Sequence, residues 1–230
     1  LLNSDHDLNI SQLAGRELGF ETKNALVTGF LGGESEVDGP CCSVVQSSPE
    51  ERCILFIEQQ IVPNTLPDRT KLLEKLIDLA QCSSGDVVIK LRSKSGSSTS
   101  VSGYKYHFED IYNIYESKCL IPSNLKLSTN SLEGLIAKSS LCISVSSTAI
   151  FKAISRGVPV AIPSDFGIKD HFGNVHFVGS GCFGKFTDIS DQYEKHPDIN
   201  WVHERMSFFN TSTDSISKRI QNFGLGSLEA

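Results

Sequence analysis

Two kinds of segment alternate along the middle of the chain. Short apolar runs predict buried β-strands at residues 53–57, 86–91, 125–128, 141–145 and 158–162. Apolar residues at helical spacing predict helices over 68–81, 104–117 and 131–138, and between Thr148 and Gly157. Strands that alternate with helices in this way are typical of a parallel sheet with helices on both faces. The predicted fold class is therefore α/β, with a Rossmann-like sheet.

The two ends of the chain differ from this middle part. A helix is predicted over 10–18 and a small strand over 24–28, followed by a linker at 31–50 that is rich in Gly, Ser, Pro and acidic residues. A closing helix is predicted over 213–223. We therefore expect residues 1–48 to be the end of an N-terminal domain plus a linker, and residues 49–230 to form the Rossmann-like domain.

Composition restricts the classes of function. Of the 230 residues, 39% are hydrophobic and 21% are charged, which is enough apolar material for a packed core. The net charge of −6 argues against nucleic acid as a partner. The sequence has no apolar run long enough to span a membrane and does not start with a signal peptide, so a cytoplasmic location is expected and peripheral membrane association stays open. Seven cysteines without a CxxC pair indicate a reducing compartment.

A turn rich in hydroxyl groups follows the predicted strand 141–145. Ser146, Ser147 and Thr148 stand directly before the next helix, where backbone N–H groups lack partners and the helix dipole is positive. Such a turn can bind a phosphate. The alternative is that Ser146 or Ser147 only caps the helix. The local pattern does not decide between the two.

Other polar side chains follow neighbouring strands of the predicted sheet. Gln59 comes after the first strand, Lys90 and Arg92 stand at the end of the second, and Asp165 follows the fifth. The carboxyl ends of parallel strands meet at one edge, where ligands of such sheets bind. Cations, an amide and hydroxyls gathered there favour an anionic ligand made of phosphate and sugar. Taken singly, Lys90 and Arg92 are also compatible with solvated strand ends.

Other motifs give weaker or negative indications. His107 stands two residues before Glu109 and can donate to a phosphate, but a single histidine is more often a core or surface residue. The run Asp165–Gly167 matches the DFG of kinases without their other motifs, and neither GxxxxGK[ST] nor GxGxxG occurs. Histidine spacing does not suit a metal. No metal or bound cofactor is therefore expected.

The order of several segments resembles a known group of enzymes. The segments 56–69, 87–92 and 144–167, together with the His107/Glu109 pair and the spacing from Asn174 to Gly181, resemble bacterial glycosyltransferases of the GT-B type. These are akin to CMP-sugar-dependent sialyltransferases and to glycosyltransferases of capsule or surface polysaccharides. The resemblance covers about residues 15–225 and implies that residues 49–230 are the nucleotide-sugar-binding half of a two-domain enzyme.

The resemblance also implies an activity and roles for residues. It implies inverting transfer of an acidic, sialic acid-like sugar from a CMP-sugar to a glycan acceptor, with Ser146, Ser147 and Thr148 at the donor phosphate. His107 would assist the leaving phosphate, although Phe108 stands where the family usually has proline. Phe151 and Lys152 stand where the family often has an acidic residue. The general base is expected in an N-terminal domain that this chain starts too late to contain.

Two other functions stay open at this point. Within nucleotide-sugar chemistry, the alternative is a UDP-sugar hexosyltransferase or an epimerase of the same two-domain fold. In another class, the alternative is a nucleotide-binding module without catalysis, because the set of Lys90, Arg92 and Ser146–Thr148 suits both classes.

Overall fold

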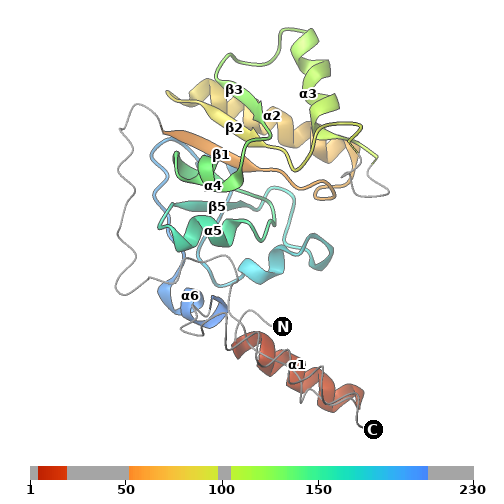
Figure 1. Cartoon of the computed structure of the whole chain (residues 1–230), viewed down its shortest axis with the longest axis vertical. Coiled ribbons are helices and arrows are strands. Elements are labelled where there is room, and N and C mark those ends of the chain that lie inside the picture. The colour runs from red at the N-terminus through yellow and green to blue at the C-terminus, as the bar shows by residue number, and fades with distance from the viewer. Residues whose placement is uncertain (1–4, 20–51, 98–104, 207–230) are drawn as a thin grey trace, which may run out of the picture. The chain divides into compact units, whose positions relative to one another are not determined.

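The computed structural model describes residues 5–19, 52–97 and 105–206 of the chain (Figure 1). The chain divides into two compact units, one of residues 1–40 and 198–230, the other of residues 41–197. The predicted strand 24–28 and helix 213–223 lie outside the described residues, and the predicted domain division after residue 48 stays a prediction. In the first unit, helices α1 (Asp5–Leu18) and α6 (Ile199–Arg205) contact each other. The sequence predicted the first of these helices only from residue 10 onwards, and it did not predict α6.

The second unit contains a six-stranded, wholly parallel sheet. Its strands lie in the order β3-β2-β1-β4-β5-β6. Their bounds are β1 Cys53–Ile57, β2 Val87–Lys90, β3 Leu125–Ser128, β4 Ser139–Ile143, β5 Val160–Pro163 and β6 Phe183–Gly184. This order is that of the Rossmann fold, so the predicted fold class is confirmed. Only β6 was not predicted, because two residues are too short to show a pattern.

Strand β1 lies at the centre of the sheet and explains the apolar run of its sequence. All five of its residues are buried, and Phe56 pairs with Ile89 of β2 on one side and with Ile143 of β4 on the other. A strand covered on both faces has no solvated side for polar residues, which is why the run is continuous rather than alternating.

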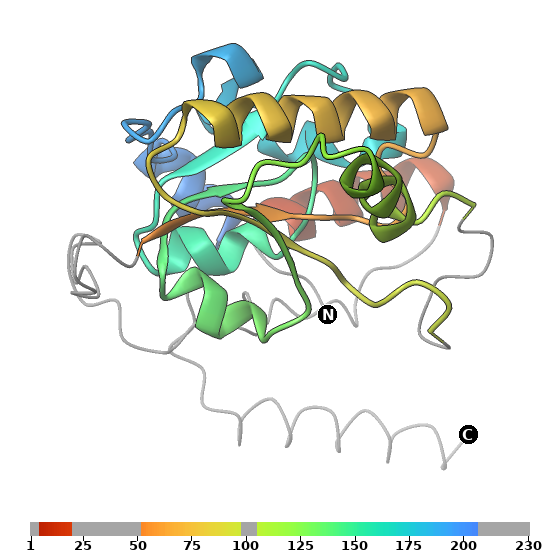
Figure 2. The ribbon, with the colours of Figure 1, turned by 90° about the horizontal axis from the view of Figure 1, so that it is seen from above.

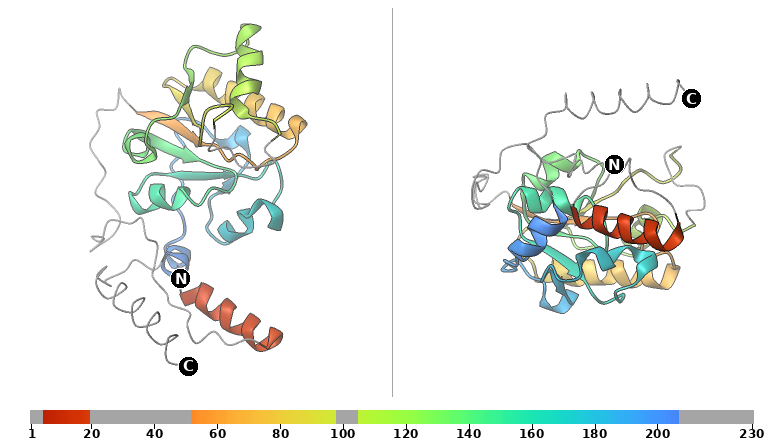
Figure 3. Two further views of the ribbon diagram at one scale, coloured as in Figure 1. Left: turned by 45° about the vertical axis from the view of Figure 1, so that its right-hand side comes forward. Right: turned by 90° about the horizontal axis from the view of Figure 1, so that it is seen from below.

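Helices cover both faces of this sheet, as Figures 2 and 3 show. Helix α2 (Leu66–Cys82) lies on one face, and the short helices α4 (Leu132–Ile136) and α5 (Ile150–Ser155) lie on the other. Helix α3 (Phe108–Ser117) packs beside α2. The 3-10 turns η2 (Asp170–Phe172), η3 (Asn174–Phe177) and η4 (Phe186–Asp188) lie in the connections that follow β5 and β6.

Helix ends follow local capping chemistry. Ser131 caps α4 as predicted, since its hydroxyl accepts a hydrogen bond from the Gly134 N–H at 3.2 Å. Gly157, expected to end α5, follows its last turn with a φ of 67°, a left-handed conformation that favours glycine. Helix α3 begins at Phe108, later than predicted, because His107 has an extended backbone and is its N-cap. No helix among the described residues has the length and apolarity that a membrane crossing needs.

The buried stripe of α2 gives a first prediction. Leu73 is fully buried in the core, so Leu73→Ala removes packed methyl groups and leaves a cavity. We expect a loss of about 2–5 kcal/mol in the free energy of unfolding, measured by urea denaturation. Asp78→Ala is the matched control, because Asp78 is exposed on the same helix and should change stability by less than about 0.5 kcal/mol. Equal losses for the two variants would contradict the packing of α2.

Candidate functional site

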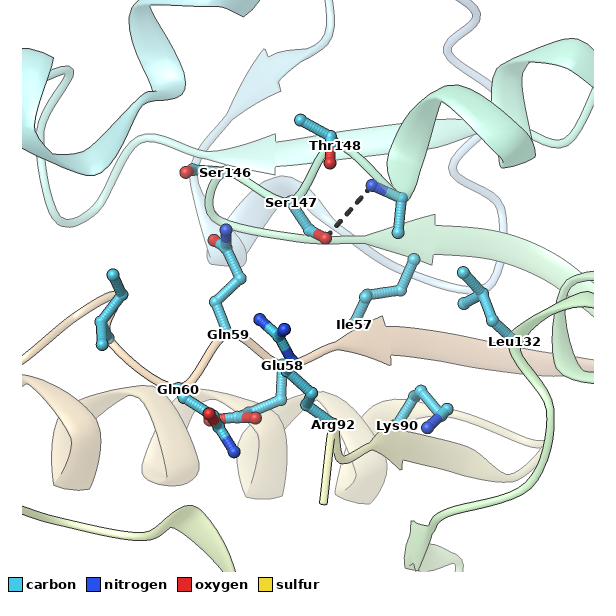
Figure 4. Close-up of a pocket in the computed structure, with 12 residues that line it drawn as sticks. Ile57, Glu58, Gln59, Gln60, Lys90, Arg92, Leu132, Ser146, Ser147 and Thr148 are labelled. Carbon is cyan, nitrogen blue, oxygen red and sulfur yellow. Dashed lines mark hydrogen bonds between the residues drawn. The ribbon is translucent and has the colours of Figure 1, made fainter. Parts of the chain in front are cut away.

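A pocket of about 440 Å³ opens at the carboxyl ends of the central strands (Figure 4). We call it the switch-point pocket. It is lined by residues that end or follow three strands and by one residue of α4, namely Ile57–Ile61, Lys90, Arg92, Leu132 and Ser146–Ala149. Strands β1 and β4 are neighbours, but the chain leaves them towards opposite edges of the sheet, to β2 and to β5. Ligands of open α/β sheets bind in the crevice at such a reversal point.

Most of the predicted site residues meet in this pocket. The structure brings together Gln59, Lys90, Arg92, Ser146, Ser147 and Thr148. Figure 4 shows the guanidinium of Arg92, the amide of Gln59 and the hydroxyl of Ser147 facing the same space. The side-chain oxygen of Gln59 is buried there and has no hydrogen-bond partner among the described residues. This geometry agrees with the convergence that the strand ends predicted, whereas ligand contacts for these residues stay predictions.

Two predicted site residues lie elsewhere. His107 is buried at the start of α3, where its Nδ1 accepts a hydrogen bond from the Glu109 N–H at 3.2 Å. Asp165 accepts a hydrogen bond from the Phe186 N–H at 2.9 Å and so holds the segment after β6. Neither residue lines the switch-point pocket. The catalytic role of His107 and the ligand contact of Asp165 thus stay predictions that this pocket does not support.

The hydroxyl groups of Ser144, Ser146 and Ser147 mostly form hydrogen bonds that hold the turn after β4 in place. Ser144 is fully buried, and its hydroxyl donates to the Ile57 carbonyl at 3.0 Å and accepts from the Ser147 N–H at 3.1 Å. The Ser146 hydroxyl donates to the Phe172 carbonyl, away from any pocket ligand. The Ser147 oxygen accepts from the Ala149 N–H at 3.2 Å, and its proton can still be donated. The N-cap of α5 is Ala149 and no side chain caps it, so neither Ser146 nor Ser147 is the helix cap that the alternative predicted.

The expected row of unpaired N–H groups before α5 is largely absent. The N–H groups of Ile150, Phe151 and Lys152 donate to the carbonyls three residues earlier, at 3.0–3.1 Å. These tight turns occupy the donors that a phosphate would need, and α5 itself has only six residues. Thr148 differs, because it is exposed and its N–H has no partner within the described part of the chain. The groups of the turn that remain available to a ligand are therefore mainly those of Thr148 and Ser147.

Two cations give the pocket its charge. Arg92 is exposed, and Lys90 is half-buried, with its ammonium group donating to the Leu91 carbonyl at 2.5 Å. Burial lowers the pKa of Lys90, and the nearby Glu58 carboxylate opposes that shift. Glu58 is itself paired with Arg69, whose side chain is almost fully buried. The charges of Lys90 and Arg92 are therefore left to attract an anion. Among the described residues, no group of three potential metal ligands comes together.

Arg69 is the residue that sequence reasoning missed. Its guanidinium donates to the carbonyls of Gln59, Gln60 and Pro63 at 3.0–3.2 Å and to the carboxylate of Glu58. One signal was available in the sequence. Position 69 lies three and four residues before Leu72 and Leu73, on the buried stripe of α2, where a charged residue needs a buried partner.

Comparison with known proteins gives the family. The sequence matches the family described as "Putative glycosyltransferase (DUF6716)" over residues 1–223. The chain belongs to this family. No curated protein matches this chain.

Several solved structures are also similar to this family member. The spinosyn forosaminyltransferase SpnP has a TM-score of 0.37 and 16% identity, and the match covers 64% of this chain and 33% of that one. The UDP-GlcNAc 2-epimerase from Methanocaldococcus jannaschii has a TM-score of 0.43 and 15% identity, with coverages of 76% and 46%. The glycosyltransferase SnogD from Streptomyces nogalater has a TM-score of 0.37 and 12% identity, with coverages of 78% and 40%. The chain thus spans less than half the length of each.

The lowered pKa of Lys90 gives a prediction about anion binding. Lys90 loses its proton at a lower pH than an ordinary lysine, so sulfate affinity should fall as pH rises from neutral towards that lowered pKa. Lys90→Arg should keep its affinity over this range, because a guanidinium stays charged. Isothermal titration with sulfate, which does not itself titrate there, measures the effect. Lys126→Arg, outside the pocket, should keep the wild-type dependence. An identical pH profile for wild type and Lys90→Arg would remove Lys90 from the site.

Proposed function

We propose that the domain binds the donor nucleotide sugar of a glycosyltransferase in the switch-point pocket. One observation carries the proposal: two cations, two amides and three hydroxyl residues line the crevice at the point where the strand order of the parallel sheet reverses. Membership of the family described as glycosyltransferases supports the same conclusion. In this proposal, the donor phosphate lies between Arg92 on one side and Ser147 and Thr148 on the other.

The chemistry of sugar transfer suits such a set of groups. An acceptor hydroxyl attacks the anomeric carbon, the bond to the phosphate oxygen breaks, and the leaving phosphate gains negative charge. Groups that are already oriented towards that oxygen stabilise the transition state more than the ground state. Arg92 and Lys90 supply positive charge, and Thr148 supplies a hydroxyl and a backbone N–H. Because the acceptor attacks from the side opposite the leaving group, the transfer inverts the anomeric configuration.

For the donor itself we propose a CMP-activated acidic sugar, on the resemblance to sialyltransferase-like enzymes. Such a donor carries one negative charge on its phosphate and one on the sugar carboxylate, and two cations, Lys90 and Arg92, line the pocket. A UDP-sugar is the competing donor to test, because a UDP-sugar hexosyltransferase or epimerase is the alternative that the sequence left open. The acceptor is proposed to be a glycan of a capsule or surface polysaccharide, reached from the cytoplasm.

Nucleotide titration tests the donor class. We expect CMP to bind more tightly than UDP, with Arg92→Ala weakening CMP binding by about 1.5–3 kcal/mol because a charged hydrogen bond is lost. The salt dependence of the affinity should flatten in this variant. Lys126→Ala, which removes an exposed charge outside the pocket, is the control. Tighter binding of UDP would favour a UDP-sugar transferase or epimerase, and nucleotide binding without any donor turnover by the full-length protein would favour a module without catalysis.

Thr148 and Ser146 make a contrasting pair of variants. Thr148→Val removes an exposed hydroxyl without changing the shape, so CMP affinity should fall by about 1.5–3 kcal/mol while thermal stability stays near that of the wild type. Ser146→Ala removes a buried hydrogen bond to the Phe172 carbonyl, so it should lower stability by about 1–3 kcal/mol. Calorimetry and thermal unfolding measure the two effects. Unchanged CMP affinity for Thr148→Val would exclude the turn as a phosphate contact.

A further inference from the structure

The wall of the switch-point pocket depends on a residue that does not line it. Residues 58–61 of this wall form the first part of the loop that leaves β1. A loop at the end of a strand has carbonyls that no neighbouring strand can pair, and buried carbonyls need donors from elsewhere. Arg69, from α2, supplies them: its Nη1 atom donates to the carbonyls of Gln59, Gln60 and Pro63 at 3.2, 3.1 and 3.0 Å.

The same guanidinium also fixes the first residue of the loop. Its Nη2 atom donates to the Glu58 carboxylate, and its Cζ lies over the ring of Phe108, 5.3 Å from the ring centre. Arg69 is only 1% exposed. A planar group with several donors in fixed directions suits this arrangement, because one side chain reaches three carbonyls and a carboxylate at once.

A second hydrogen bond extends this order to the neighbouring loop. The Gln60 amide, buried behind the pocket, donates to the Ser93 hydroxyl at 2.7 Å, and Ser93 directly follows Arg92. Two residues further on, the Ser95 N–H donates to the Glu109 carboxylate at 2.6 Å, which ties the loop to the start of α3. The position of Arg92 is thus connected through Ser93 and Gln60 to the loop that Arg69 holds.

We infer that Arg69 is a positioning residue for the anion site, which acts through Gln60 and Ser93 on Arg92. This inference rests on the proposed function for the identity of the ligand. Arg69 does not touch the anion in this scheme. Its guanidinium holds the loop after β1 in place, Gln60 transmits that position to Ser93, and the guanidinium of Arg92 is presented to the phosphate together with the Gln59 amide.

The test compares affinities for CMP and for sulfate between the wild type and variants of both loops. Arg69→Lys keeps the charge but loses the planar fork, and Ser93→Ala removes the acceptor of the Gln60 amide with little change in volume. Each should weaken binding of both probes by about tenfold, the size of one lost charged contact. Leu73→Ala is the matched control, because Leu73 is a buried residue of the same helix that does not line the pocket, so the variant should leave both affinities unchanged below its unfolding temperature.

A double-variant comparison separates positioning from a general loss of structure. In the background of Arg92→Ala, the substitution Ser93→Ala should cost almost nothing further, because the group it positions is gone. An equal loss in both backgrounds, or a loss no larger than that of Leu73→Ala, would overturn the inference. If Arg69→Lys does not fold, Ser93→Ala alone decides. If sulfate binding follows the expected pattern but no nucleotide binds, the proposed function fails and the inference about Arg69 stands. If neither sulfate nor CMP binds the wild type, both fail.

Discussion

The pairing of β1 with β2 on one side and with β4 on the other is the constraint from which the site follows. Both neighbours run parallel to β1, so the three strands end at the same edge of the sheet. The chain then leaves β1 towards β2 and leaves β4 towards β5, and the two loops diverge instead of covering each other. The switch-point pocket lies at this divergence, and its walls consist of residues that end or follow β1, β2 and β4, together with Leu132 of α4.

The loops beside such a crevice have backbone carbonyls that no neighbouring strand pairs. On the β1 side, Arg69 donates hydrogen bonds to these carbonyls. The loop from Glu58 to Pro63 passes beyond the last strand pairing, and three of its carbonyls accept hydrogen bonds from one buried guanidinium. On the β4 side, Ser144 has the corresponding role, since its hydroxyl joins the Ile57 carbonyl to the Ser147 N–H. Both walls are therefore fixed by side chains that lie behind them.

The sequence was sufficient for the fold and for placing six of the eight predicted site residues in one pocket, and insufficient for the direction of individual side chains. Gln59, Lys90, Arg92 and the hydroxyl turn could be placed because the position of a residue after a parallel strand already determines the edge at which it lies. The partner of the Ser146 hydroxyl could not be foreseen, because the Phe172 carbonyl comes 26 residues later, from the segment after β5. Local spacing likewise does not show that His107 caps α3 from a buried position.

The pairing of Arg69 with Glu58 also determines the electrostatics of the pocket. Glu58 lies in the pocket wall and acts electrostatically on Lys90, so an uncompensated carboxylate there would offset much of the attraction that Lys90 exerts on an anion. A buried carboxylate without a partner would moreover be costly to keep ionised. Arg69 satisfies that charge from behind the wall, where no ligand competes for it. The burial of one ion pair thus leaves Lys90 and Arg92 as cations that line the pocket without a carboxylate partner of their own among the residues that the structure describes, which suits the anionic donor that we propose.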